Sequence, residues 1–238
     1  QPFYLSNEAT TLWTGLPAGQ AIEKFSDMNG QWIAGKTYTF TEVYAPDGYY
    51  LDPKAIKVTF DLYGNVTVDK TTLASASADD IKVLNNPIIL KVVKTGSNGD
   101  KLKDIQFSLE RLDANGAPEP FTYIGTNNGK ETILTASASI TLTTDVDGVV
   151  QVKGLKDGTY RLTEITTIAG YNLLSSPILI AISDRGKTAT YTSSTVTTPT
   201  ALGINANVLT LKLRNKPGFK LPATGVIGRK LPPGIPLL

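Results

Sequence analysis

Short runs of alternating apolar and polar residues recur along the chain and limit its fold more than any other feature of the sequence. Such runs occupy residues 38–43, 56–62, 149–153 and 209–214. Turn dipeptides such as Asp147-Gly148 separate them. Alternation of period two is typical of half-buried strands, and glycine-containing dipeptides favour the tight turns between them. With no convincing amphipathic helix, the pattern predicts an all-β sandwich or barrel.

One motif occurs twice. It reads GKTYTFTE…GY at residues 35–49 and DGTYRLTE…GY at residues 157–171, with the same spacing from glutamate to glycine. An alternating strand follows each copy and ends in an asparagine, Asn85 or Asn215. Repeats of this kind indicate repeated structural units. We therefore expect two tandem β domains, at residues 1–86 and 87–217, and a tail at 218–238.

The residue types that the chain lacks exclude whole classes of chemistry. There are no cysteines and no histidines, which rules out disulfides, Cys/His zinc sites, Ser-His-Asp triads and imidazole switches. The formal net charge of only +2 gives no indication of a nucleic-acid-binding surface. The acidic turn 145–148 has Lys156 where a calcium-binding EF-hand needs glutamate, so we expect an Asx turn there. No metal or cofactor is expected, and no run is apolar enough to span a bilayer.

Strand parity places three polar residues on the apolar face of the second predicted domain. They are Lys94 after Leu90 and Val92, Glu164 after Tyr160 and Leu162, and Asn215 after Leu209, Leu211 and Leu213. One inward polar residue near a strand end usually reaches water at the rim, and a Lys–Glu pair can be a plain buried salt bridge. Three such residues, in the first, a middle and the last strand, favour a shared site.

The chemistry open to these three groups is specific. Burial lowers the pKa of a lysine and raises that of a glutamate, because each charged form loses hydration. A neutral amine is a nucleophile, and a protonated carboxyl can polarise an amide and shuttle protons. The amine of Lys94 can then attack the side-chain amide of Asn215 and release ammonia beside Glu164. We expect this intramolecular isopeptide bond, and no enzyme activity on external substrates, since no motif for a carboxylate-pair hydrolase is present.

Both motif copies resemble the Cna B-type (prealbumin-like) domains of Gram-positive surface proteins and pilins. The strand at 90–94 and the sequence IQFSL at 105–109 fit the same pattern, and the resemblance covers roughly residues 1–217. It implies two tandem immunoglobulin-like/prealbumin-like β-sandwiches. It also implies a spontaneous isopeptide bond between the first-strand lysine and the last-strand asparagine, promoted by the middle-strand glutamate. Carried over by position, these are Lys94, Asn215 and Glu164.

The first predicted domain departs from that pattern. Aligning Phe3 with Phe107 puts its expected lysine thirteen residues before Phe3, ahead of the start of the chain. We therefore expect this domain to lack its N-terminal strand. Glu42 and Asn85 lie on the apolar parity without a lysine partner, and Lys24 does not fit the family pattern. Either Asn85 joins a lysine of a longer protein, or another chain supplies the strand.

The tail contains Leu221, Pro222, Thr224 and Gly225 in the order LPATG, which resembles the LPxTG signal of sortase substrates. Sortase would cleave after Thr224 and transfer its carbonyl to an amine. Residues 226–238 are shorter than the ~20 apolar residues that a membrane span needs.

These features together predict an extracellular structural protein of a Gram-positive cell wall or pilus, a pilin or wall-anchored stalk. Its expected partners are sortase and other pilin subunits or peptidoglycan. The alternative is an adhesin that binds a host protein or glycan through two loops of the second domain, residues 117–140 and 191–206, which are rich in Thr, Ser and Asn.

Overall fold

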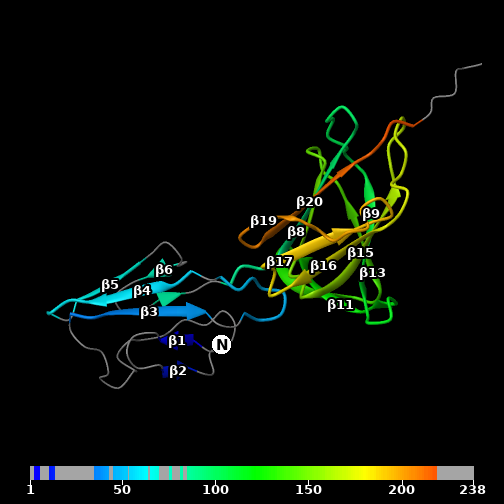
Figure 1. Cartoon of the computed structure of the whole chain (residues 1–238). Helices are drawn as coiled ribbons and strands as arrows, with labels where there is room; N and C mark the ends of the chain where they lie inside the picture. The colour runs from blue at the N-terminus through cyan, green and yellow to red at the C-terminus, as the bar shows by residue number, and fades with distance from the viewer. Residues whose placement is uncertain are drawn as a thin grey trace, which may run out of the picture.

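The computed structural model describes residues 3–5, 11–13, 35–42, 45–52, 54–63, 65–69, 75–76, 81–82 and 85–218. These residues form an elongated all-β molecule (Figure 1). Sheets of the N-terminal region, residues 3–86, lie at one end, and a larger C-terminal sandwich, residues 87–217, lies at the other. No helix in the described part of the chain is long and apolar enough to cross a membrane.

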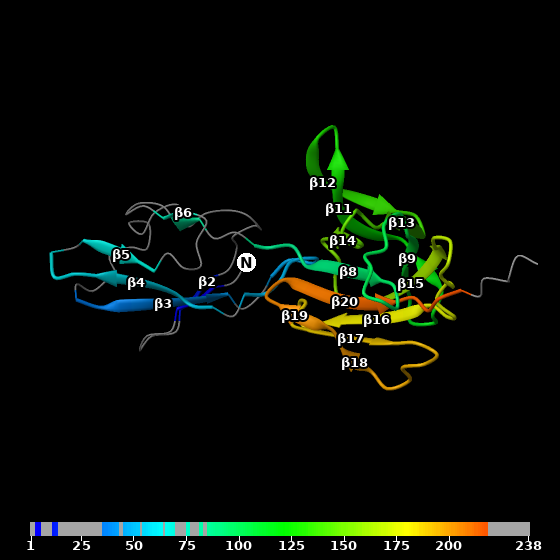
Figure 2. The same ribbon diagram turned by 90° about the horizontal axis from the view of Figure 1, so that it is seen from above.

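Two sheets build the C-terminal sandwich. The first has the order β10-β9-β15-β16-β17-β18, with β13 also paired to β9, and the second has the order β12-β11-β14-β8-β20-β19. Figure 2 shows the two layers from above. The first comprises β9 (Gln106–Leu112), β10 (Pro118–Glu119), β13 (Ser139–Thr143), β15 (Gly158–Thr166), β16 (Ile178–Ser183), β17 (Thr188–Thr192) and β18 (Thr200–Ala201). The second comprises β8 (Ile89–Thr95), β11 (Phe121–Asn127), β12 (Lys130–Ala136), β14 (Val149–Lys153), β19 (Gly203–Asn205) and β20 (Val208–Arg214).

Alternating side chains close the core between these layers. Every second residue of β8 and of β16 is buried, and the same alternation runs through β20. Tyr160, Phe107 and Phe121 are the largest fully buried aromatic side chains, and the Phe121 and Tyr160 rings meet edge to face at 6.0 Å. Strands β8 and β20, the first and last of the sandwich, run parallel as neighbours. The predicted all-β sandwich is therefore confirmed.

The N-terminal region repeats one layer of that sandwich. Its sheet has the order β2-β1-β3-β4-β5, with β1 (Phe3–Leu5), β2 (Thr11–Trp13), β3 (Thr37–Glu42), β4 (Ile56–Phe60) and β5 (Val66–Val68). Phe3 pairs with Glu42 between β1 and β3, as Phe107 pairs with Glu164 between β9 and β15. A second, two-stranded sheet joins β6 (Ser75–Ala76) to β7 (Ile81–Lys82). The equal registers support the alignment of Phe3 with Phe107; the division into two domains at 86–87 stays a prediction.

The sequence motif repeats in backbone detail after the glutamate. In the first Gly-Tyr loop, residues 45–52, Tyr49 bridges to Pro87 and Ile88 N–H donates to Gly48 C=O at 2.9 Å. In the second Gly-Tyr loop, residues 167–174, the corresponding bridge joins Tyr171 to Pro217 and the corresponding hydrogen bond joins Gly218 to Gly170 at 2.8 Å. The chain therefore leaves the β7 and β20 segments in the same way.

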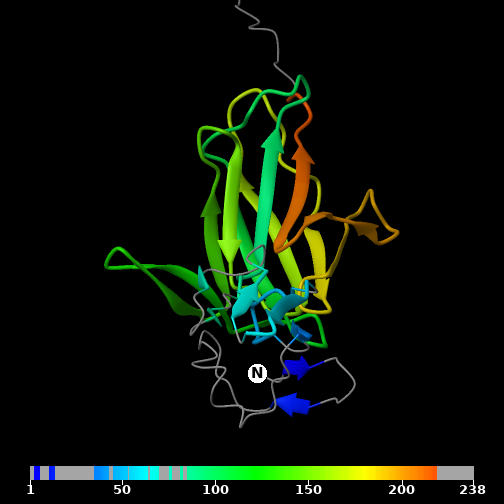
Figure 3. The same ribbon diagram turned by 90° about the vertical axis from the view of Figure 1, so that its left-hand side faces the viewer.

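The two segments expected as loops contain strands, which corrects that expectation. Residues 121–136 form the β11–β12 hairpin, which projects from the sandwich (Figure 3). Its turn residues Asn128 and Gly129 both have positive φ, 50° and 75°, the conformation of the tight type I′ turn that Asn-Gly favours. Residues 191–206 include the short edge strands β18 and β19. At the acidic turn, Asp145 accepts hydrogen bonds from the backbone N–H groups of Asp147 and Val149, which makes it the expected Asx turn.

Candidate functional site

Three buried polar side chains meet between the two layers of the C-terminal sandwich. Lys94 at the end of β8 is 0% exposed, Asn215 just after β20 is 1% exposed, and Glu164 in β15 is 6% exposed. The parallel pairing of β8 with β20 brings Lys94 next to Leu213, two residues before the asparagine. Glu164 reaches them from the opposite sheet. The strand parity of the sequence points all three toward the core, and the structure places them in contact there.

Each pair among the three groups is in contact. Lys94 Nζ donates to Asn215 Oδ1. The same ammonium lies 3.3 Å from Glu164 Oε1, and Asn215 Nδ2 donates to that oxygen at 2.8 Å. One oxygen of the Glu164 carboxyl therefore contacts both the Lys94 nitrogen and the Asn215 amide nitrogen. In an amine–amide condensation, the first of these nitrogens replaces the second on the amide carbon.

The surroundings favour a neutral amine. Burial is the main cause that lowers the pKa of Lys94 below its ordinary value of 10.5, and the neighbouring Glu164 offsets part of that effect. The Lys94 nitrogen also lies 5.8 Å from the ring centroid of Phe107. This ring comes from β9 and covers the site on its core side. A larger neutral fraction makes the amine a better nucleophile at neutral pH than an exposed lysine.

A loop completes the site with contacts that strand parity does not predict. Thr167 Oγ1 accepts a second hydrogen bond from Asn215 Nδ2 at 2.9 Å, and the backbone N–H of Leu174 donates to Glu164 Oε2 at 2.7 Å. Both residues belong to the second Gly-Tyr loop. The sequence signal for this loop was the Gly170-Tyr171 dipeptide of the repeated motif, which marked the turn but not the atoms it brings to the glutamate.

This arrangement is suited to one covalent reaction. The hydrogen bond from Lys94 Nζ to Oδ1 holds the amine against the Asn215 amide, and the two acceptors of Nδ2 fix the amide plane. Rigid placement of an amine next to an amide replaces the entropy loss of a bimolecular encounter. Because all three side chains are buried, water competes poorly for the amide carbon.

Residues 89–196, which include Lys94 and Glu164, match the model of one family, described as "SpaA: Prealbumin-like fold domain". The match covers less than half of the chain and shows a prealbumin-like fold for these residues. The match agrees with the Cna B-type resemblance of the motif. Asn215 lies beyond the matched residues but within the same sandwich, just after β20, the strand that pairs with the Lys94 strand. A comparison with curated proteins found no match.

Solved structures similar to this chain include pilus proteins, at low identity. The C-terminal fragment of the pilus adhesin SpaC from Lactobacillus rhamnosus GG is 20% identical with a TM-score of 0.41, over 93% of this chain and 90% of that one. An open-conformation structure of the same adhesin matches over 29% of its length. The group B streptococcus pilus 2b backbone protein is 16% identical with a TM-score of 0.38, over 91% and 78% of the two chains.

The described part of the chain shows no second cluster of an amine, an amide and a carboxyl around the other predicted site residues. Glu42 ends β3 opposite Phe3. Asn85 is partly buried, and the carbonyl of its neighbour Asn86 accepts a hydrogen bond from Tyr50 N–H in the first Gly-Tyr loop. In the described part of the N-terminal region, β7 pairs only with β6. Lys24 and the LPATG sequence lie outside the described residues, so their roles stay predictions.

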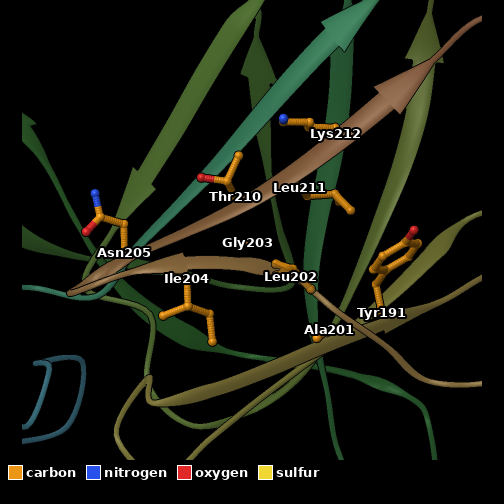
Figure 4. A pocket seen from close by; sticks show the side chains of 9 residues that line it. All are labelled: Tyr191, Ala201, Leu202, Gly203, Ile204, Asn205, Thr210, Leu211 and Lys212. Atoms are coloured by element: carbon orange, nitrogen blue, oxygen red, sulfur yellow. The ribbon is translucent and has the colours of Figure 1, made fainter.

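A separate groove of about 480 Å³ lies at one edge of the prealbumin-like domain (Figure 4). It is lined by Tyr191, Ala201, Leu202, Gly203, Ile204, Asn205, Thr210, Leu211 and Lys212. All of these belong either to the second insert, residues 191–206, or to β20. The lining is largely apolar with one cation, Lys212, and it includes none of the three buried polar residues.

Proposed function

We propose that this chain is a structural subunit of a Gram-positive cell surface, a pilin or wall-anchored stalk, that stabilises itself by an isopeptide bond between Lys94 and Asn215. The single observation that carries the cross-link is the buried contact of an amine, an amide and a carboxyl. The structural role follows from it, because a bond between the first and last strands lets tension bypass the hydrogen bonds of the sandwich.

The reaction balances without an external reagent. Nζ of Lys94 attacks Cγ of Asn215 and forms the new C–N bond. Glu164 accepts a proton from that nitrogen and delivers it to Nδ2, the Cγ–Nδ2 bond breaks, and ammonia leaves. The product is a secondary amide, so no oxidant is needed and the bond is stable to reduction. This suits a chain with no cysteine.

Intact-protein mass spectrometry tests the cross-link. The mass of the purified chain should be lower than its sequence mass by one ammonia. The Lys94→Ala variant should instead have the full mass calculated from its own sequence. Lys91→Ala is the matched control, because Lys91 lies on the same strand with the opposite orientation. Glu164→Ala should stall the reaction and leave most of the chain uncondensed. A wild-type chain at full sequence mass contradicts the proposal.

The surface role adds sortase as a partner, through Leu221, Pro222, Thr224 and Gly225. Incubation of the chain with a purified sortase and an amine nucleophile should release the residues after Thr224 and attach the nucleophile to its carbonyl. Thr224→Val should block this transfer and leave the Lys94–Asn215 bond unaffected. Mass spectrometry separates the two reactions, so one can fail without the other.

The groove at residues 191–212 favours adhesion as a second candidate function. A pocket of this size with apolar walls and a few polar groups is a typical ligand site. The test is binding of the chain to immobilised matrix proteins and glycans. Ile204→Asp in the groove should weaken binding, and Ile133→Asp on the exposed β12 strand should not. Equal effects of the two variants contradict a role for the groove.

A further inference from the structure

The two copies of the repeated motif differ at the third residue after the glutamate. Because the spacing from glutamate to glycine is the same in both, Ala45 in the first Gly-Tyr loop corresponds to Thr167 in the second. Ala45 is fully buried and offers no polar side-chain atom. Thr167 carries a hydroxyl, and its oxygen contacts the Asn215 amide. This hydroxyl therefore belongs to the copy in which an amine, an amide and a carboxyl meet.

The contacts of the Asn215 side chain use both of its N–H donors. An amide nitrogen carries two such donors. At Nδ2, one donates to Glu164 Oε1 at 2.8 Å and the other donates to Thr167 Oγ1 at 2.9 Å. The amide oxygen Oδ1 accepts from Lys94 Nζ. The nitrogen that leaves in the condensation is thus held from two sides, by β15 and by the loop that follows it.

The hydrogen bond to Thr167 is the one that can persist while the amide reacts. Glu164 Oε1 accepts an N–H of the intact amide, but the carboxyl must become a donor when it delivers a proton to Nδ2. That hydrogen bond therefore reverses during the reaction, whereas Thr167 Oγ1 remains an acceptor throughout. Because the leaving nitrogen gains positive charge as it is protonated, the acceptor binds it more tightly than it binds the neutral amide.

Thr167 also lies on the side of the site that is nearest to solvent. Glu164 and Asn215 are buried, whereas Thr167 is partly buried and its neighbours Thr166 and Ile168 are exposed. Of the two acceptors that hold Nδ2, Thr167 is therefore the more exposed, and ammonia released there reaches water on the Thr167 side. Loss of ammonia makes the reaction irreversible, because ammonia that stayed beside the new amide could attack it.

We propose that Thr167 is a further catalytic residue of the Lys94–Asn215 condensation. Its Oγ1 holds Nδ2 as an acceptor while Glu164 supplies the proton, and the freed ammonia leaves along its exposed side. The bond changes are those of the proposed reaction: Nζ–Cγ forms, Cγ–Nδ2 breaks, and the proton from Nζ ends on ammonia. Thr167 itself neither gains nor loses a proton. This inference rests on the proposed cross-link and adds a group that accelerates it.

The rate of ammonia loss tests this role in the full chain. The chain is made in a short pulse of cell-free synthesis, samples are quenched in acid at intervals, and intact mass spectrometry gives the condensed fraction at each time. Thr167→Val keeps the shape of the side chain without the hydroxyl, and Thr167→Ala copies the first loop. We expect both variants to condense about tenfold more slowly than wild type, because each loses one hydrogen bond in the transition state. Thr167→Ser keeps the acceptor and should condense at nearly the wild-type rate.

The neighbouring hydroxyl separates this role from a structural one. Thr166 Oγ1 accepts from the backbone N–H of Gln106 at 3.2 Å, so Thr166→Val removes a hydrogen bond beside the site and should leave the rate unchanged. Thr167→Val should still reach the wild-type end point, since only its rate falls. Condensation of Thr167→Val at the wild-type rate, to a full or a reduced end point, overturns the inference, as does equal slowing in Thr166→Val. A wild-type chain that keeps its full sequence mass contradicts the cross-link itself.

Discussion

The N-terminal region and the C-terminal sandwich contain a similar central sheet, yet among the described residues only the C-terminal sandwich shows an amine beside the glutamate of the repeated motif. Phe3 is the register partner of Glu42 in one sheet, as Phe107 is of Glu164 in the other. In the C-terminal sandwich β8 lies between β14 and β20 and supplies Lys94. In the described part of the N-terminal region, no strand takes that place beside β7. The motif around the glutamate therefore specifies the sheet, and the cross-link chemistry depends on a separate strand.

Removing the amide should give the largest effect on this comparison. Asn215→Ala prevents the bond but leaves the Lys94–Glu164 pair in place, so the change in stability reports mainly the lost cross-link. The bond joins residues 121 positions apart, and closing a loop of that length stabilises by about 5 kcal/mol. Denaturant unfolding of the C-terminal sandwich should show this loss. Asn205→Ala, an exposed asparagine of β19, should leave the free energy of unfolding nearly unchanged.

Glycine substitutions compare the first Gly-Tyr loop, which packs on the C-terminal sandwich at Gly154, with the second, where no described atom lies within 4 Å of a Cβ added at Gly170. Gly48 and Gly170 both have positive φ, 82° and 91°, so alanine costs about 1–2 kcal/mol at either position. At Gly48 the new Cβ also meets the Gly154 carbonyl, and we expect a larger loss together with opening of the junction between the first Gly-Tyr loop and the sandwich. Thermal unfolding and limited proteolysis between residues 82 and 89 measure both effects. Equal losses in the two variants contradict a packed junction.

The pH dependence distinguishes a free Lys94 from a cross-linked one. In Asn215→Ala the amine stays free and buried, with a pKa lowered from 10.5 mainly by burial. Between the lowered folded pKa and the unfolded pKa, the unfolded chain binds more protons than the folded one, so stability rises with pH over that window. In a wild type that is cross-linked as proposed, this amine has become an amide and does not titrate. The variant should therefore gain stability relative to wild type as the pH rises toward 10.5.

The smallest expected effect concerns the ion pair between the first Gly-Tyr loop and the C-terminal sandwich, which together form the junction. Asp47 and Arg185 side chains are 63% and 22% exposed, and exposed pairs contribute about 0–1 kcal/mol. Asp47→Ala should lower the free energy of unfolding by no more than that, and added salt should reduce the difference further. A loss comparable to that of Gly48→Ala shows that the pair, rather than the close backbone approach, holds the junction.

The alternation of side chains along the strands predicted much of this structure, because each strand of a two-layer sandwich buries only one of its two faces. It directed Lys94, Glu164 and Asn215 inward from sequence alone, and the repeated motif aligned two sheets that share their register. It missed Thr167 and the Leu174 N–H, since these come from a loop whose path over the site depends on tertiary packing. It also read the β11–β12 hairpin as a loop, although Asn128-Gly129 is a tight-turn signal, because the polar exposed faces of that hairpin give little hydrophobic contrast.

Peptide mapping of the intact chain tests the central claim most directly. Trypsin cannot cleave after Lys94 once its amine is an amide, so the digest should contain one branched species that joins the Lys94 and Asn215 peptides. The peptide that contains Asn85 should be linear and of unmodified mass in a preparation of this chain alone. Linear, unmodified peptides for both Lys94 and Asn215 would contradict the account.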